Sequence, residues 1–436
     1  MYDIRITKIH IEKVRNLKDI EIPVVDSDGE RKHLIITGKN GSGKTSLLNA
    51  ISKHLDWLAT QGDPEVYRRN YEFCLKHIDA LIQDNKPENE IQNAKEQLKS
   101  YEKTWRNAQQ GVNLSLSAPK DGVMGHFRNG GFVLAYYKDN RIFEAEKPKH
   151  VEKVELKETY PMNPQRQGVP RYTFIKYLLD MKVTEALAAR SPDKERQQRA
   201  ESIRTWFNNF EALLQNIFND CGGKDGENQK TVKLAFDEET YAFTIHEDGK
   251  EPFDFNNLSA GFAAVLDIVV DLIMRMEKHT GGRFKFDLPG IVLIDEIETH
   301  LHLELQRMIL PFLTTFFPNI QFIISTHSPF IINSLENIVI YDLENQILVN
   351  EKQGLTDVPY DGIVEGYFRA DKLSALLREK YERFKGLVAK KDVTDEDMRE
   401  ISQLEVFLDE IPDYLALDIT TEYERMKSEF EAREDL

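Results

Sequence analysis

The 436-residue chain has few cysteines and no long apolar run. Its two cysteines, Cys74 and Cys221, lie far apart, and neither has the Cys or His spacing of a zinc site. This scarcity argues against a disulfide framework, and we expect a reducing, cytoplasmic environment. The N-terminal residues alternate without the apolar core of a signal peptide. The most apolar helical segment, residues 262–276, contains Asp267 and Asp271 and is too short to cross a bilayer, so we expect no membrane span.

Basic residues are also in the minority. The chain has 57 Lys and Arg against 74 Asp and Glu, which gives a formal net charge of -17. This balance argues against a surface coated for nucleic acid, although a local basic groove could exist within an acidic whole. The short basic clusters at residues 68–69 and 194–199 are more simply explained as solvated helix faces. DNA binding therefore stays open.

The hydrophobic pattern predicts a mixed α/β protein. Isoleucines alternate with polar residues through residues 4–22, which is the period of half-buried strands. Apolar runs at residues 34–36, 291–294 and 320–324 lack this alternation and are separated by helical patterns. Such runs are typical of a largely parallel sheet that is covered on both faces. Alternation on both sides of a turn at residues 237–240 predicts a β-hairpin as well.

The length predicts one large core with inserted modules. We expect an N-terminal part of the core (1–62), a helical hairpin insertion (63–118), a β part of the core (119–173), a helical arm (174–228), a C-terminal part of the core (229–357) and a charged helical tail (358–436). The inserted hairpin fits a packed lid and a projecting arm equally well. Thr394 and Asp397 give a helix start signal in the tail.

Residues 38–45 read GKNGSGKT and match the pattern G-x-x-x-x-G-K-[ST] between a predicted strand and a predicted helix. Glycines let backbone N–H groups wrap phosphates, and the helix N-terminus adds a favourable dipole. We expect Lys44 to reach the β- and γ-phosphates of ATP and the Thr45 hydroxyl to ligate Mg²⁺. The predicted nucleotide contacts in this loop are Gly38, Lys39, Asn40, Gly41, Ser42, Gly43, Lys44, Thr45 and Ser46.

Two further strands are predicted to deliver polar residues at their carboxyl ends, where ligands of open α/β sheets bind. Asp295 follows one buried strand and is expected to hold Mg²⁺, and the adjacent Glu296 is expected to polarise the attacking water as a general base. His327 follows the other strand and is expected to contact the γ-phosphate or the water. A histidine after a strand is more often structural, but here it is the third element of one pattern.

The segment NNLSAGF at residues 256–262 places Ser259 at a predicted helix start, which is either a simple N-cap or a second phosphate contact. The order of glycine loop, Leu-Ser-x-Gly, apolar-Asp-Glu and Ser-Thr-His resembles the ABC-type P-loop ATPases. The strings DEIETHLH at 295–302 and STHSP at 325–329 resemble their RecF/SMC-related branch, including OLD-type and defence-associated (Septu-like and PARIS-like) ATPase subunits. The resemblance covers roughly three-quarters of the chain, and its motifs specify the ATPase class better than the biological role.

The resemblance implies an ABC-type core whose Ser259 and Gly261 complete the ATP site of a second subunit. It implies a homodimer or higher homo-oligomer, with residues 297–300 at the subunit interface and His327 as the switch histidine. Residues 137–141 fall where the family has its glutamine loop, but they contain no glutamine. The chain also lacks the Cys-x-x-Cys hook of the family's arms and the acidic pattern of a Toprim nuclease, so any effector nuclease is expected to be a separate polypeptide.

Three hypotheses follow for function. The first is an ATP-hydrolysing switch that controls a partner effector in antiphage defence or DNA maintenance. The second is a scaffold for which ATP is a structural ligand, and the third is the nucleotide-binding subunit of a membrane transporter. Intact Glu296 and His327 argue against the scaffold. The long segment between Thr45 and Leu258, with the altered signature around Ser259, argues against the transporter.

Overall fold

The structure is a computed structural model that describes residues 4–25, 32–163, 169–219, 231–350, 355–356, 358, 362–363, 375–390, 392–409 and 417–432. The chain forms two compact units, Met1–Val358 and Pro359–Leu436. Cys74 is buried and free, whereas Cys221 lies outside the described residues, as do the segment junctions expected at 228 and 357. Within the described part, no helix is both long and apolar enough to cross a membrane.

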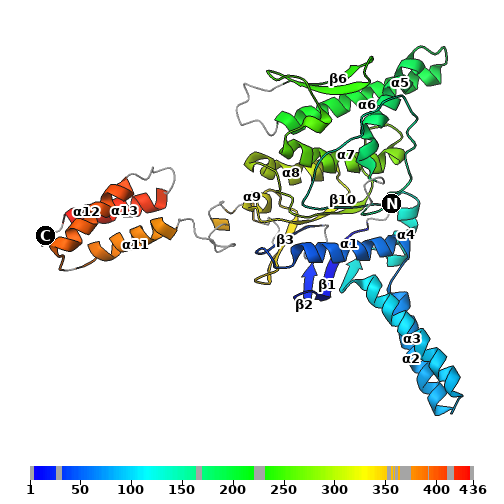
Figure 1. The fold of residues 1–436 in the computed structure, drawn as a ribbon, viewed down its shortest axis with the longest axis horizontal. Coiled ribbons are helices and arrows are strands. Elements are labelled where there is room, and N and C mark those ends of the chain that lie inside the picture. Colours follow the sequence, from blue (N-terminus) through cyan, green and yellow to red (C-terminus); the bar gives the residue numbers. More distant parts are fainter. Residues whose placement is uncertain are drawn as a thin grey trace. The chain divides into compact units, whose positions relative to one another are not determined.

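A six-stranded sheet forms the centre of the first unit (Figure 1). Its strands, in spatial order, are β12 (Ile347–Val349), β11 (Ile338–Asp342), β3 (His33–Thr37), β10 (Ile320–Ser325), β9 (Gly290–Ile294) and β5 (Val133–Tyr137). The five strands from β11 to β5 are parallel, and β12 runs antiparallel to β11. Every residue of these five strands is buried, which explains the apolar runs without alternation and confirms the predicted α/β class.

Helices cover both faces of this sheet. Figure 1 shows α1 (Lys44–Thr60) along one side, and α7 (Ala260–Thr280) and α8 (Leu303–Phe316) along the other. Helix α1 buries Leu47, Leu48, Ile51, Leu55 and Leu58. Each such side chain contributes about 2 kcal/mol through burial, so the helix that begins at the predicted phosphate loop is firmly anchored.

Two antiparallel sheets accompany the central one. The first has the order β2-β1-β4, with strands β1 (Ile6–Val14), β2 (Leu17–Pro23) and β4 (Val112–Leu116). The second comprises β6 (Val232–Asp237), β7 (Ala242–Glu247) and β8 (Phe253–Asp254). Phe236 pairs with Phe243 across the β6–β7 hairpin, as the alternation at these residues predicts.

Helices α2 (Glu65–Gln83) and α3 (Glu88–Gln109) form the inserted hairpin, which projects away from the sheet in Figure 1. It has its own small cluster of Ile78, Leu81 and Ala94. The ring contacts of Trp57 with Tyr67 and of Tyr71 with Trp105 lie near its base, where it joins the core. Of the two alternatives that the sequence left open, the structure shows the projecting arm.

The segment expected as a β part of the core, 119–173, contains less sheet than its designation implied. It contains helix α4 (Lys120–Arg128), strand β5, irregular backbone and the short 3₁₀ helix η2 (Pro170–Thr173). Its apolar side chains Phe143, Ala145 and Met162 are buried although they stand on irregular backbone and not on a strand. Helices α5 (Phe174–Ala189) and α6 (Lys194–Asn219) follow and contact each other along their length.

The described helices of the second unit are α11 (Ala375–Val388), α12 (Asp395–Asp409) and α13 (Leu417–Glu431). They share a core that includes Phe384, Ile401 and Tyr423. The N–H of Asp397 donates to Thr394 Oγ1 at 3.2 Å, and the N–H of Thr394 donates to Asp397 Oδ2 at 3.1 Å. This reciprocal cap confirms the helix start that the sequence predicted there.

Candidate functional site

The carboxyl ends of β3, β10 and β9 meet at one edge of the central sheet because these neighbouring strands are parallel. The glycine loop follows β3, His327 follows β10, and Asp295 and Glu296 follow β9. The side chains of Ser325 and Asp295 are hydrogen-bonded to each other. The backbone N–H of His327 donates to the Glu298 carboxylate. The fold therefore brings the three predicted strand-end elements together, at the edge where α/β sheets bind ligands.

The glycine loop has a backbone that only glycine adopts readily. Gly38, Gly41 and Gly43 have φ angles of 129°, 87° and 106°. A Cβ on Gly38 would also lie 2.9 Å from Ser42 Oγ. Gly43 stands at the N-cap position of α1, where the described side chains provide no cap and the first turn carries no acidic residue. The first N–H groups of α1 are thus left available for an anion.

Lys44 lies buried within this loop, with 5% of its surface exposed. Its ammonium donates to the carbonyl oxygens of Gly38, at 2.7 Å, and Lys39, at 3.2 Å. Burial lowers the pKa of Lys44, while Glu296 and the acids around it raise it. The Ser42 hydroxyl is buried beside this loop without a hydrogen-bond partner. A buried cation and an unsatisfied hydroxyl at a helix N-terminus fit the phosphates of a nucleotide.

Asp295 and Glu296 are linked to the neighbouring strand through one hydroxyl. Ser325 Oγ donates to Asp295 Oδ1 at 2.5 Å and accepts from the N–H of Glu296 at 2.8 Å. Asp295 is 2% exposed, whereas Glu296 is partly exposed and has a φ of 46°, in the left-handed region. Carboxylate and hydroxyl oxygens are ligands that Mg²⁺ prefers, so Asp295 and Thr45 fit a magnesium site chemically.

His327 is held at this edge by a residue that we did not predict as part of the site. Its backbone N–H donates to Glu298 Oε1 at 2.5 Å, and its ring Nε2 is buried without a hydrogen-bond partner among the described residues. Burial lowers the pKa of His327, and Lys44 lowers it further. The imidazole is therefore neutral at pH 7 and has one free ring nitrogen. Glu298 stands in the DEIETH string, for which the family resemblance implied a place at the subunit interface.

Arg141 is a second unpredicted member of the site. Its Nη1 donates to the carbonyl oxygen of Asp295 at 2.7 Å, and its Nη2 donates to that of Glu296 at 2.7 Å. The side chain is 3% exposed. Arg141 occupies the segment where a glutamine loop was expected, but nothing in its sequence context indicated contact with the strand-end acids.

The glycine loop is also tied to the strand on its other side. Lys39 Nζ lies 2.8 Å from Glu344 Oε1, and the N–H of Lys39 donates to Glu344 Oε2 at 3.3 Å. Glu344 stands in the turn after β11, where Asp342 accepts from its N–H at 2.8 Å. Lys39 thus serves to position the loop in this structure, while its predicted nucleotide contact stays a prediction.

The predicted signature residues lie at the start of α7. Ser259 is the N-cap residue, but it is exposed and its side chain makes no capping hydrogen bond. Helix capping therefore does not explain why a serine stands at this position. Gly261 is buried, and a Cβ there would lie 3.1 Å from the carbonyl oxygen of His300 and 3.0 Å from Leu305. The start of α7 therefore packs closely against the segment that follows the strand-end acids.

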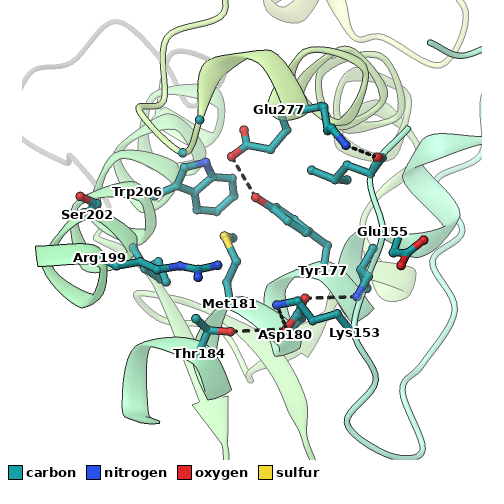
Figure 2. A pocket seen from close by; sticks show the side chains of 16 residues that line it. Lys153, Glu155, Tyr177, Asp180, Met181, Thr184, Arg199, Ser202, Trp206 and Glu277 are labelled. Atoms are coloured by element: carbon teal, nitrogen blue, oxygen red, sulfur yellow. Dashed lines mark hydrogen bonds and ion pairs between the residues drawn. The ribbon is translucent and has the colours of Figure 1, made fainter. Parts of the chain in front are cut away.

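A separate hollow of about 620 Å³ lies between α5, α6, the end of α7 and residues 153–156 (Figure 2). The Tyr177 hydroxyl donates to Glu277 there at 2.9 Å, next to the ring of Trp206. Lys153 is paired with Asp180 at 3.2 Å. None of the glycine-loop or strand-end residues lines this hollow, so it is distinct from the candidate nucleotide site.

Two family models match the chain. An AAA domain described as a putative AbiEii toxin of a type IV TA system matches residues 173–333, and another AAA domain matches residues 8–71. The second match contains the glycine loop, and the first contains Asp295, Glu296 and His327. The α/β fold and these two matches show that the chain contains segments of P-loop domains of the AAA type.

Within this class, the chain is similar to ATPases of retron and Septu systems. It is 32% identical over 151 residues to the retron Ec83 probable ATPase of Escherichia coli, covering 33% of this chain and 27% of that protein. It is 25% identical over 380 residues to the retron Vc95 probable ATPase of Vibrio cholerae serotype O1 biovar El Tor, covering 71% and 68%. It is 23% identical over 337 residues to the Septu protein PtuA of Bacillus mycoides (strain KBAB4), covering 76% and 39%.

The chain thus spans about a quarter of the Ec83 relative and about two-fifths of the Septu relative. Among solved structures, the SMC head domain from Thermotoga maritima is 11% identical, with a TM-score of 0.33 and coverage of 78% of this chain and 94% of that one.

Proposed function

We propose that the protein binds ATP with Mg²⁺, hydrolyses it, and uses the cycle as a switch. The observation that carries this proposal is the convergence of Lys44, Asp295 and Glu296 at one sheet edge. Burial lowers the pKa of Lys44, and the nearby carboxylates of Glu296 and Asp295 oppose this effect. The three side chains have distinct chemical properties. These are the cation, the metal-binding carboxylate and the general base that phosphoryl transfer to water needs.

In this proposal each side chain has one role. The backbone N–H groups of residues 38–45 and the Lys44 ammonium hold the phosphates, and Thr45 and Asp295 would hold Mg²⁺. The bound metal ion would offset charge on the phosphate oxygens. Glu296 orients the attacking water and accepts its proton, and neutral His327 contacts the γ-phosphate or that water through its free ring nitrogen.

Two substitutions test this proposal. We expect Glu296→Gln to bind ATP normally but to release phosphate at least ~100-fold more slowly, because it removes a general base. Lys44→Ala should weaken ATP binding itself, because it removes the buried cation. Phosphate release and titration with a fluorescent ATP analogue measure the two effects separately.

Near-normal turnover by Glu296→Gln would remove Glu296 from the role of base. A wild-type protein that binds ATP without releasing phosphate would instead support the scaffold function. Circular dichroism of each variant checks that the fold is retained.

The proposed output is control of a partner effector, such as a nuclease on a separate chain, in antiphage defence or DNA maintenance. The similarity to retron and Septu ATPases supports this part of the proposal. Mass spectrometry and nucleic-acid analysis of what copurifies with tagged Glu296→Gln in Mg²⁺-ATP would identify the effector and show whether DNA is bound.

A further inference from the structure

Arg141 is a buried cation whose described hydrogen bonds all end on backbone carbonyl oxygens. Besides Asp295 and Glu296, its guanidinium donates to Lys138 at 3.1 Å, Ile297 at 3.2 Å and Thr299 at 3.4 Å. Burying a guanidinium without a hydrogen-bonded carboxylate is costly. Arginine is the one side chain that offers five N–H donors in a fixed planar arrangement. Its presence here, despite the cost of burial, indicates that the site needs several carbonyl oxygens to be held at once.

Four of these five carbonyl oxygens, all except that of Lys138, belong to the turn that carries the proposed base. Glu296 has a left-handed backbone, which is unfavourable for a residue with a Cβ and persists where surrounding contacts determine it. The N–H groups on either side are also held, Asp295 by the carbonyl of Tyr137 at 2.8 Å and Ile297 by that of Ser325 at 3.1 Å. Arg141 completes this set by holding the carbonyl side of the turn.

Helix α7 contributes acidic side chains near Arg141. Burial lowers the pKa of Arg141, and Asp267 is the acid that most strongly opposes this effect. Asp267 also pairs with Arg171, and Asp271, one turn later, accepts from the Tyr137 hydroxyl at 2.8 Å and from Arg275 at 2.7 Å.

We propose that Arg141 is a positioning residue for hydrolysis: it holds the Asp295–Thr299 turn so that Glu296 faces the nucleotide, and it is dispensable for ATP binding. This inference rests on the proposed function, in which Glu296 is the base. It assigns a task to the segment where the sequence lacks the expected glutamine.

Arg141→Lys tests this role because lysine keeps the charge but cannot reach the same set of carbonyl oxygens. We expect its kcat to fall at least ~10-fold, in line with a small misplacement of a reacting group, while its affinity for an ATP analogue stays within about 2-fold. Arg275→Lys is the matched control. Arg275 is also buried and donates to the carbonyl oxygens of Leu134, Tyr160 and Pro161, away from the turn. It should lower the melting temperature without a selective loss of kcat.

A double variant separates positioning from general damage. If Arg141 acts through Glu296, then Arg141→Lys should reduce the residual rate of Glu296→Gln by less than about 2-fold, because the two changes remove one effect. If the rate losses of the two single variants multiply in the double variant, the inference is overturned. An Arg141→Lys variant with wild-type kcat would also overturn it. A wild-type protein without turnover would overturn the proposed function and this inference together, whereas an active one with unaffected Arg141→Lys overturns only the latter.

Discussion

Burial determines the charge of several side chains around the glycine loop. Burial is the main cause that lowers the pKa of Lys44, and Glu296 is the first of the acids that oppose it. The same cause lowers the pKa of His327. An ammonium that nearby carboxylates keep charged and an imidazole that stays neutral are complementary to an anionic ligand and its attacking water.

His54 shows how this burial affects stability. It lies on α1 with 1% of its surface exposed, and burial lowers its pKa from 6.5 to about 4. The unfolded chain therefore binds the proton more readily between these values, so stability is lost as the pH falls from 6.5 to 4. We expect wild-type protein to lose on the order of 3 kcal/mol more than His54→Leu over this range.

Urea denaturation of both proteins at pH 7, 5.5 and 4.5 measures this difference. The substitution itself changes packing, so the comparison uses the change with pH and not the absolute free energies of unfolding. Parallel pH profiles for the two proteins would show that His54 is protonated in the folded state as easily as in the unfolded one.

The sequence predicted the site residues that form a continuous motif and missed those that act through distant backbone. Asp295 and Glu296 could be found because they follow one buried run, and their roles stay predictions. Arg141 could not, because its acceptors are carbonyl oxygens more than 150 residues away, which any residue type provides. Glu344 was missed because it lies 305 residues from Lys39, although the contact joins two side chains.

At the scale of elements, buried strands were the easiest to predict. The runs at β9 and β10 are apolar throughout because both faces are covered, and few other elements give that pattern. The hairpin α2–α3 was predicted as helical but not as an arm, because a lid and an arm bury the same stripe. In 119–173 the apolar run at residues 131–137 did identify strand β5, but the rest of this segment is helical or irregular.

The α2–α3 hairpin should be separable from the nucleotide site. Its cluster of Ile78, Leu81 and Ala94 is distinct from the main core, and its ring contacts lie nearer its base. We expect replacement of residues 76–99 by a short Gly/Ser linker to change the melting temperature by less than about 4 °C and to leave ATP affinity unchanged. Thermal unfolding and nucleotide titration measure both. Loss of ATP binding in the shortened protein would show that the arm supports the site.

At the scale of the whole molecule, the proposed dimer has a specific test. Ser259 is exposed and its hydroxyl does not cap α7. We expect Glu296→Gln to double its mass in Mg²⁺-ATP, as measured by light scattering, because bound ATP is not consumed. Adding Ser259→Arg should keep it monomeric while ATP still binds, because a bulky cation would block the second subunit.

Ser202→Arg is the control for that experiment, since Ser202 is exposed on α6, far from α7's start in sequence. A dimer that forms despite Ser259→Arg, or that Ser202→Arg disrupts equally, would contradict the assignment of the signature surface.

The position of β3 within the central sheet has a consequence for the protein's synthesis. This strand carries the glycine loop near the N-terminus, yet its neighbours are β10 and β11. His33 on β3 accepts a hydrogen bond from the N–H of Phe322, 289 residues later. At translation rates of about 5 to 20 residues per second, roughly 15 to 60 seconds separate the two strands at the ribosome. A nascent chain therefore cannot assemble the candidate nucleotide site until β10 has been made, so any ligand of this site can stabilise the fold only after that point.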